Sequence, residues 1–181
     1  LAAVPAALLL FRFPWLAWVG VPLLVLVAVN VGYARRNDER ALANDLALIT
    51  ECALLVPVTW AVSTCAGTVP LPGTVPAQIA VLTVVCWLVL AGSTLHVKSL
   101  IRERRDPRYA RASRAFAVSS LVVSVALASK WGLPEGLALV VRFAALAVRA
   151  SLLGRRHGRA MVTGLVELET FDLVPVAAWH A

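Results

Sequence analysis

The feature that most constrains this chain is a series of long apolar segments separated by short loops. A membrane-spanning helix needs about 20 consecutive apolar residues. Leu1–Leu10 is about half that length, so we expect it to be the end of a further helix. The pattern predicts an all-α fold, a polytopic transmembrane helical bundle with six complete spans plus a partial N-terminal one, as a single domain over residues 1–181. The predicted complete spans are Pro14–Tyr33, Ala41–Val62, Ala77–Leu100, Ser113–Ser129, Leu137–Leu153 and Met161–Trp179.

The composition supports a membrane protein. Hydrophobic residues make up 60% of the chain and charged residues 15%, with a mean hydropathy of +0.82. Soluble domains are about 45–50% apolar, so this chain has too little polar surface to coat a soluble globule. A net charge of +7 would suggest nucleic acid in a soluble protein. Here the basic residues lie in short loops, so membrane topology explains them and we expect no nucleic-acid partner.

Nearly all lysines and arginines lie in every second loop of the chain. The loops between these contain only Arg12 and Lys130. The positive-inside rule places the basic loops in the cytoplasm. Every predicted span then alternates in direction without conflict. The basic loops contain Arg35, Arg36, Arg40, Lys98, Arg102, Arg104, Arg105, Arg108, Arg111, Arg114, Arg155, Arg156 and Arg159.

The three cysteines, Cys52, Cys65 and Cys86, are widely spaced in apolar surroundings. They form no Cys-x-x-Cys motif and no Cys/His spacing of the kind that binds zinc. We therefore expect buried thiols, no metal site and no cofactor.

Polar residues continue into the second predicted span. Asn37, Asn44 and Glu51 are spaced by seven, and Asp38 and Asp45 repeat on the neighbouring face. Asn37 and Asp38 suit a helix start. Glu51 lies about ten residues into the span that begins near Ala41, roughly 15 Å along a helix, which is close to mid-bilayer. We expect it to be protonated, paired or facing water.

The last two predicted spans carry opposite charges at matching depths. Arg142 and Arg149 are seven residues apart, and Glu167, Glu169 and Asp172 follow across a short turn. Arginine stays charged at physiological pH, so ion pairs that hold the helices together are one interpretation. The other is functional, because three acids exceed two arginines and leave one carboxylate for a proton or a cation.

A basic stripe leaves the third predicted span at the cytoplasmic side. Thr94, Lys98, Arg102 and Arg105 follow one another at spacings of four, four and three, with His96 on another face. Such a stripe attracts anionic lipid head groups, so we expect the bilayer itself as a partner. It is also suited to a phosphate-bearing substrate, with His96 as the proton donor or acceptor.

Three segments, "ARRNDERALANDLA", "STLHVKSLIRERRDPRYARAS" and "GLVELE", resemble the YwiC-like family of bacterial integral membrane proteins. The order of these segments and their placement between the predicted helices match the family as well. The resemblance implies a multi-pass protein of the bacterial cytoplasmic (inner) membrane without an established activity. It also implies that further helices, one with a His-Gly-Ala-Trp motif, precede Leu1.

Three functions stay open at this level. The intramembrane cluster of Asn44, Asp45, Glu51, the two arginines and the three C-terminal acids suits a transporter. It also suits a membrane-assembly component in which polar groups only stabilise. The alternative is a membrane-embedded transferase acting on an isoprenoid or lipid phosphate, broadly similar to UbiA-type enzymes. Its magnesium-binding carboxylates would be Asp38, Asp45, Glu103 and Asp106, although the NDxxD and DxxxD motifs of those enzymes are absent.

Overall fold

The computed structural model describes residues 10–38, 40–64, 75–103, 106–129 and 133–152. These residues form α2 (Leu16–Arg35), α3 (Leu42–Thr64), α4 (Ala77–Val97), the π-helix η1 (Lys98–Arg102), α5 (Pro107–Ala128) and α6 (Leu133–Leu152). The all-α prediction is confirmed for this part of the chain. The protein divides into an N-terminal unit, Leu1–Trp87, and a C-terminal unit, Leu88–Ala181, with the boundary inside α4. The predicted single domain over 1–181 stays a prediction.

The described residues contain four helices long and apolar enough to cross a membrane: Leu16–Arg35, Leu42–Thr64, Ala77–Ile101 and Pro107–Ala128. The predicted number of spans, six complete and one partial, is therefore not confirmed. The predicted Leu137–Leu153 span is helical as α6, but its sequence includes Arg142 and Arg149. Residues 1–9 and the predicted span Met161–Trp179 lie outside the described residues.

The turn between α2 and α3 corrects the prediction that Asn37 and Asp38 start a helix. Asn37 has a positive φ of 55°, and the backbone N–H of Asp38 donates to the carbonyl of Tyr33 at 3.0 Å. A left-handed residue followed by such a bond ends a helix, and asparagine tolerates this conformation. Asn37 and Asp38 therefore end α2, and α3 begins only at Leu42. The polar stripe on α3 is shortened to Asn44, Asp45 and Glu51.

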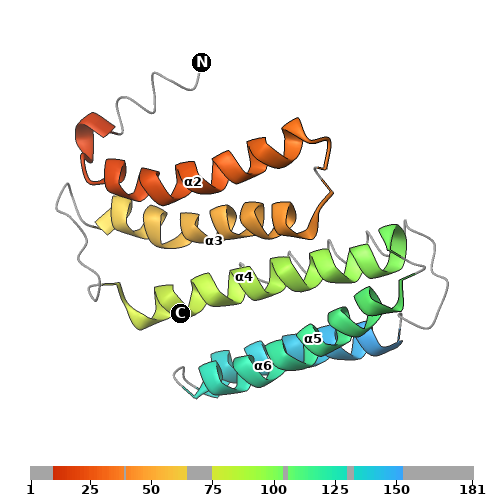
Figure 1. Cartoon of the computed structure of the whole chain (residues 1–181). Helices are drawn as coiled ribbons and strands as arrows, with labels where there is room; N and C mark the ends of the chain where they lie inside the picture. Colours follow the sequence, from red (N-terminus) through yellow and green to blue (C-terminus); the bar gives the residue numbers. More distant parts are fainter. Residues whose placement is uncertain (1–9, 39, 65–74, 104–105, 130–132, 153–181) are drawn as a thin grey trace. The chain divides into compact units, whose positions relative to one another are not determined.

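α2 and α3 run antiparallel in the N-terminal unit (Figure 1). Pro57 lies inside α3 and does not interrupt it. The Thr50 hydroxyl donates to the carbonyl of Leu46 at 2.8 Å and accepts from the Trp87 indole Nε1 at 3.1 Å. This bond explains why Trp87 lies within a span rather than at a membrane interface.

α4 ends in a π-helical turn. In η1 the backbone N–H of Glu103 donates to the carbonyl of Lys98 at 2.7 Å, which is the wider spacing of a π-helix. Asp106 then adopts an extended conformation, and its side chain accepts from the backbone N–H of Arg108 at 2.8 Å. With an N-cap aspartate and Pro107 at the first turn, α5 starts at Pro107 rather than at the predicted Ser113.

α5 and α6 form a hairpin (Figure 1). In α5, hydroxyl side chains are buried and apolar ones exposed, as is typical of membrane helices. The buried residues of α5 are Ser113, Ser120 and Ser124, whereas Val118 and Val122 are exposed. In lipid, small and hydroxyl side chains permit close helix packing, and branched apolar side chains face the hydrocarbon. The close approach is tightest at Gly136, where a Cβ atom would lie 2.9 Å from the carbonyl oxygen of Ala128.

Candidate functional site

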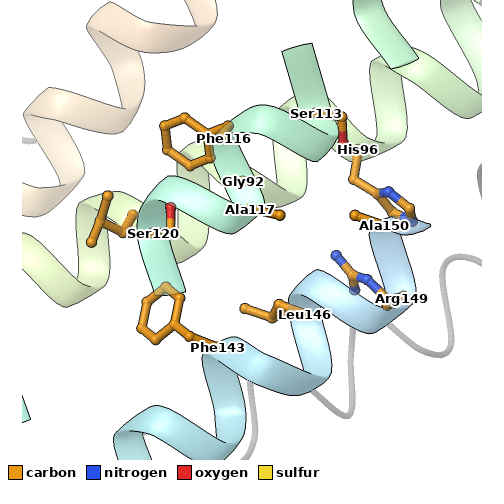
Figure 2. Close-up of a pocket in the computed structure, with 11 residues that line it drawn as sticks. Gly92, His96, Ser113, Phe116, Ala117, Ser120, Phe143, Leu146, Arg149 and Ala150 are labelled. Atoms are coloured by element: carbon orange, nitrogen blue, oxygen red, sulfur yellow. The ribbon is translucent and has the colours of Figure 1, made fainter. Parts of the chain in front are cut away.

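Three helix faces of the C-terminal unit surround one small cavity, which has a volume of about 20 Å³ (Figure 2). The residues on α4 are spaced by four, and those on α5 and α6 by three or four, so each helix presents a single face. The lining residues are Leu88, Gly92 and His96 from α4, Ser113, Phe116, Ala117 and Ser120 from α5, and Phe143, Leu146, Arg149 and Ala150 from α6. We call this space the α4–α6 cavity.

The polar residues of the α4–α6 cavity are deeply buried. His96 is 2% exposed, Ser120 3% and Ser113 5%. Within the part of the chain that the structure describes, neither Nε2 of His96 nor Oγ of Ser120 has a hydrogen-bond partner. A buried polar atom without a partner costs free energy. These two atoms therefore give the cavity a capacity to hydrogen-bond something placed inside it.

A positive charge lies at the same cavity. Arg149 is half-buried, and it is close enough to His96 for its charge to act on the imidazole. Figure 2 shows the guanidinium of Arg149 and the ring of His96 at the same end of the cavity, with Ser120 and Phe143 toward the other end. A guanidinium group carries five N–H donors. The cavity therefore combines one cation with hydroxyl and imidazole groups.

Aromatic rings form the remaining walls. Phe143 is 2% exposed, and Phe116 faces Gly92, where a Cβ atom would meet the ring at 3.4 Å. The absence of a side chain at Gly92 leaves room for the ring. The edge of an aromatic ring is electropositive. Among the described lining residues there is no carboxylate, so the charged group is a cation, while the hydroxyl and imidazole groups can both donate and accept hydrogen bonds.

The N-terminal unit contains a different polar contact, from α2 to α3. The amide Nδ2 of Asn30 donates to Oε1 of Glu51 at 2.8 Å. Both residues are half-buried, and Glu51 is the tenth residue of the 23-residue helix α3. The other amide atom, Oδ1 of Asn30, is buried without a partner among the described residues. Glu51 is thus paired, as expected for an acid at this depth, but with a neutral amide.

The predicted site residues fall into both units. Asn44 and Asp45 lie near the start of α3, with Asp45 in its first turn, where an acid is favourable for the helix dipole. Arg149 lines the α4–α6 cavity, whereas Arg142 is half-buried on α6 and does not line it. Glu167, Glu169 and Asp172 lie outside the described residues, so their predicted ion pairs with the two arginines stay a prediction.

The predicted cytoplasmic stripe is divided by the structure. His96 belongs to the α4–α6 cavity, and Lys98 is 3% exposed at the start of η1. Arg102 lies in η1, and Arg105 is outside the described residues. Binding of anionic lipid by these residues stays a prediction.

Sequence reasoning missed several residues of these sites. Asn30 is the only Asn, Gln, Asp or Glu within α2, and this isolation in an apolar helix is the signal that finds it. Ser113, Ser120 and Ser124 are spaced by seven and four, which places them on one helix face. Phe116 and Phe143 carry no such signal, because apolar residues are abundant on every face of a membrane helix. The sequence also assigned His96 and Arg149 to separate clusters, and the structure brings them together.

No group of three or more His, Cys, Asp or Glu side chains that would suit a metal ion lies among the described residues.

The fold and its apolar helices define a multi-span helical membrane protein. Comparison with known proteins makes this more specific. Residues 1–60 match the family described as YwiC-like protein. An uncharacterized protein of Haemophilus influenzae is 32% identical over 80% of this chain, and the uncharacterized protein YwiC of Bacillus subtilis is 31% identical over 67% of it. The chain belongs to the YwiC-like family, as the resemblance of its loop segments predicted.

The chain spans about half the length of these two relatives, 55% of the first and 47% of the second. No solved structure matches it significantly. The descriptions of these two relatives name no activity.

Proposed function

We propose that this chain is part of a membrane transporter in which Glu51 takes up and releases a proton. The observation that supports it is the hydrogen bond between Glu51 on α3 and Asn30 on α2. An ionisable group inside a membrane is costly and is retained where it serves a pathway or a relay. Glu51 lies about 14 Å from the start of α3, at 1.5 Å per residue, so it is far from either end of the helix.

The chemistry of the pair suits proton exchange. An arginine or lysine partner would hold a carboxylate permanently ionised, whereas the partner of Glu51 in the described chain is a neutral amide. A protonated carboxyl group has an O–H that can donate to Oδ1 of Asn30, the amide atom that otherwise has no partner among the described residues. An ionised carboxylate accepts from Nδ2 only. The same pair therefore accommodates both protonation states with different numbers of hydrogen bonds.

The test is proton movement through the full-length protein in liposomes. Vesicles loaded with a pH-sensitive dye would be given a potassium gradient, and valinomycin would then set the membrane potential. The potassium salts would be gluconate, chloride and phosphate in turn, to reveal any coupled anion. We expect protein-dependent proton flux that Glu51→Gln removes, because the glutamine side chain keeps the shape but has no titratable proton.

The matched control is Glu103→Gln, which removes the same charge from an exposed acid after η1. It should leave the flux unchanged. Normal flux in Glu51→Gln, or equal loss in both variants, would contradict a relay through Glu51. No protein-dependent flux under any of the three salts would instead favour a membrane-assembly component, in which the Asn30–Glu51 bond only joins two helices.

The alternative function, a transferase acting on an isoprenoid or lipid phosphate, has less support. One observation favours it, because His96 and Arg149 are groups that bind phosphate and line the same cavity. Two observations oppose it. The cavity has a volume of about 20 Å³, which is enough for about one water molecule and too small for a phosphate group. The carboxylate of Asp106, one of the predicted magnesium ligands, caps α5.

We also propose that the protein lies in the cytoplasmic membrane with its basic loops on the cytoplasmic side, near anionic lipid head groups. Arg108, Arg111 and Arg114 support this, because they are exposed in the first turns of α5 where a membrane surface would meet them. A single cysteine at Arg111, in a variant lacking the native cysteines, should react with a membrane-impermeant maleimide only in inverted vesicles. Labelling in right-side-out cells would reverse the orientation.

A further inference from the structure

The strongest unassigned feature of the molecule is the α4–α6 cavity of the C-terminal unit (Figure 2). It is separate from the Asn30–Glu51 pair, which belongs to the N-terminal unit. We infer that one ordered water molecule occupies the His96 end of this cavity and joins Nε2 of His96 on α4 to polar groups of α5 and α6. The inference does not depend on proton transport by Glu51.

The imidazole of His96 is the first argument. The side chain is 2% exposed and lines the cavity, and its Nε2 atom has no hydrogen-bond partner among the described residues. Burial of such an atom without a hydrogen bond costs free energy. A buried hydroxyl can turn toward a carbonyl of its own helix, as Ser124 does with Leu121. Nε2 lies on the side of the imidazole ring away from its own backbone, so its partner has to come from outside α4.

The polar groups of the other two helices are the second argument. Figure 2 shows Ser113 of α5 and Arg149 of α6 at the end of the cavity where His96 lies. The hydroxyl of Ser113 can donate and accept a hydrogen bond. Arg149 has another interaction in the protein, and a guanidinium with five N–H donors can bond a water molecule in addition. Ser120 follows Ser113 by seven residues, about 10.5 Å along α5, so it is too far away to share the same water.

The volume and the charge of the cavity favour water over other guests. A space of about 20 Å³ exceeds the minimum of about 10–15 Å³ that one water molecule needs, and it is too small for a polyatomic ion. A water molecule both donates and accepts, so it suits Nε2 in either tautomer of the neutral imidazole. A halide ion only accepts, and it would have to lose its own hydration to enter. Because Arg149 interacts elsewhere in the protein, the cavity does not require an anion to balance its charge.

The test is whether a water molecule lies against Nε2 of His96 in the full-length protein. The protein would be isotopically labelled at its histidine nitrogens, reconstituted in bilayers and studied by proton-detected solid-state NMR. A soluble gadolinium complex would suppress the signals of bulk and surface water. We expect a correlation between water protons and Nε2 of His96 that survives the gadolinium complex. The signal that disappears in His96→Gln identifies His96 among the histidines.

Two variants probe the water and two control for it. Ala150 is 6% exposed and lines the cavity at the His96 end (Figure 2), so Ala150→Val should fill the space and abolish the correlation. Ala145→Val makes the same change on the exposed side of α6 and should keep it, as should Ser120→Ala at the other end of the cavity. Ser113→Ala removes one partner of the water and should weaken the correlation, which keeps the test decisive where Ala150→Val does not fold.

Three results would overturn the inference. No water correlation at Nε2 of His96 in the native protein would mean that the cavity is dry. A correlation that the folded Ala150→Val protein or Ser113→Ala leaves unchanged would place the water outside the proposed position. A saturable shift of the His96 signal when chloride replaces gluconate at constant ionic strength would show that the cavity takes an anion instead.

Discussion

In the N-terminal unit, polar side chains on neighbouring helices contact one another, whereas in the C-terminal unit they surround a space. Asn30 donates to Glu51 at 2.8 Å, and Trp87 donates to Thr50 at 3.1 Å. His96 and Ser120 instead direct partnerless atoms toward the α4–α6 cavity among the described residues. Direct bonds join helices to each other, and a polar space is suited to a ligand. The two regions therefore show two uses of polarity inside one membrane protein.

The comparison also concerns how tightly the helices pack. α2 has no buried residues, and neither Gly20 nor Gly32 would bring a Cβ atom within 4 Å of another group. α5 and α6 approach so closely that Gly136 has no room for a side chain. Packing therefore holds the C-terminal hairpin, and the Asn30–Glu51 bond carries more of the contact between α2 and α3. Four sets of substitutions test these differences between the two units.

Phe143→Ala should have the largest effect. The side chain is 2% exposed and forms a wall of the α4–α6 cavity, so its removal enlarges a space that the helices cannot easily close. We expect a loss of about 3 kcal/mol in the free energy of unfolding, measured by steric trapping or by denaturant titration in micelles. Leu137→Ala on the exposed side of the same helix is the control, and an equal loss there would contradict tight packing of the hairpin.

Gly136→Ala should have the second largest effect on stability. A Cβ atom at this position would lie 2.9 Å from the carbonyl oxygen of Ala128 and 3.2 Å from its Cβ, so α5 and α6 must separate. Overpacking of this kind costs about 2 kcal/mol, which would appear as a lower thermal unfolding midpoint. Gly32→Ala, in the open surroundings of α2, should keep the midpoint or raise it slightly because alanine favours helix. A tolerated Gly136→Ala would show that the hairpin is looser than described.

The Asn30–Glu51 hydrogen bond should make a smaller contribution to the free energy of unfolding, and this contribution should depend on both side chains. Glu51→Leu alone leaves the amide of Asn30 without its acceptor, and we expect a loss of about 1 kcal/mol, in the range of hydrogen bonds between membrane helices. Asn30→Leu combined with Glu51→Leu should recover most of it. A double-mutant cycle measures this coupling. Strictly additive losses would mean that the two side chains do not act as a pair in the bilayer.

Ser120→Ala should have the smallest effect on stability. Its hydroxyl has no partner among the described residues, so no hydrogen bond is lost and a buried polar atom is removed. The unfolding midpoint should stay equal to that of the native protein or rise slightly. Ser124→Ala is the matched comparison, because its hydroxyl donates to the carbonyl of Leu121 at 2.7 Å. A clear destabilisation by Ser120→Ala would show that its hydroxyl already has a partner.

Much of the helical fold could be predicted because length and hydropathy act locally. The spans beginning near Pro14, Ala41 and Ala77 all correspond to helices in the described chain. The ends of the helices were harder to predict from the sequence, because they depend on short-range hydrogen bonds. Asn37 ends α2 through a left-handed turn, and Asp106 starts α5 as an N-cap. Both residue types serve at either end of a helix, so composition alone does not separate the two roles.

The candidate sites were predicted less completely. The depth of Glu51 was evident from its position, but its partner Asn30 is 21 residues away. His96 and Arg149 were each recognised as polar residues in an apolar setting, in two different clusters. Their common cavity depends on how α4, α5 and α6 pack, and periodicity gives the face of each helix without giving its neighbour.

The sequence by itself determined that this is a multi-span helical membrane protein, because the bilayer requires about 20 apolar residues per span whatever the helices contact. It also predicted that Glu51 is protonated, paired or facing water. Only the tertiary structure decided that Glu51 is paired with Asn30 and that His96, Ser120 and Arg149 share one cavity. The physical reason is that burial in lipid is a property of each segment, whereas hydrogen bonds and cavities depend on which segments meet.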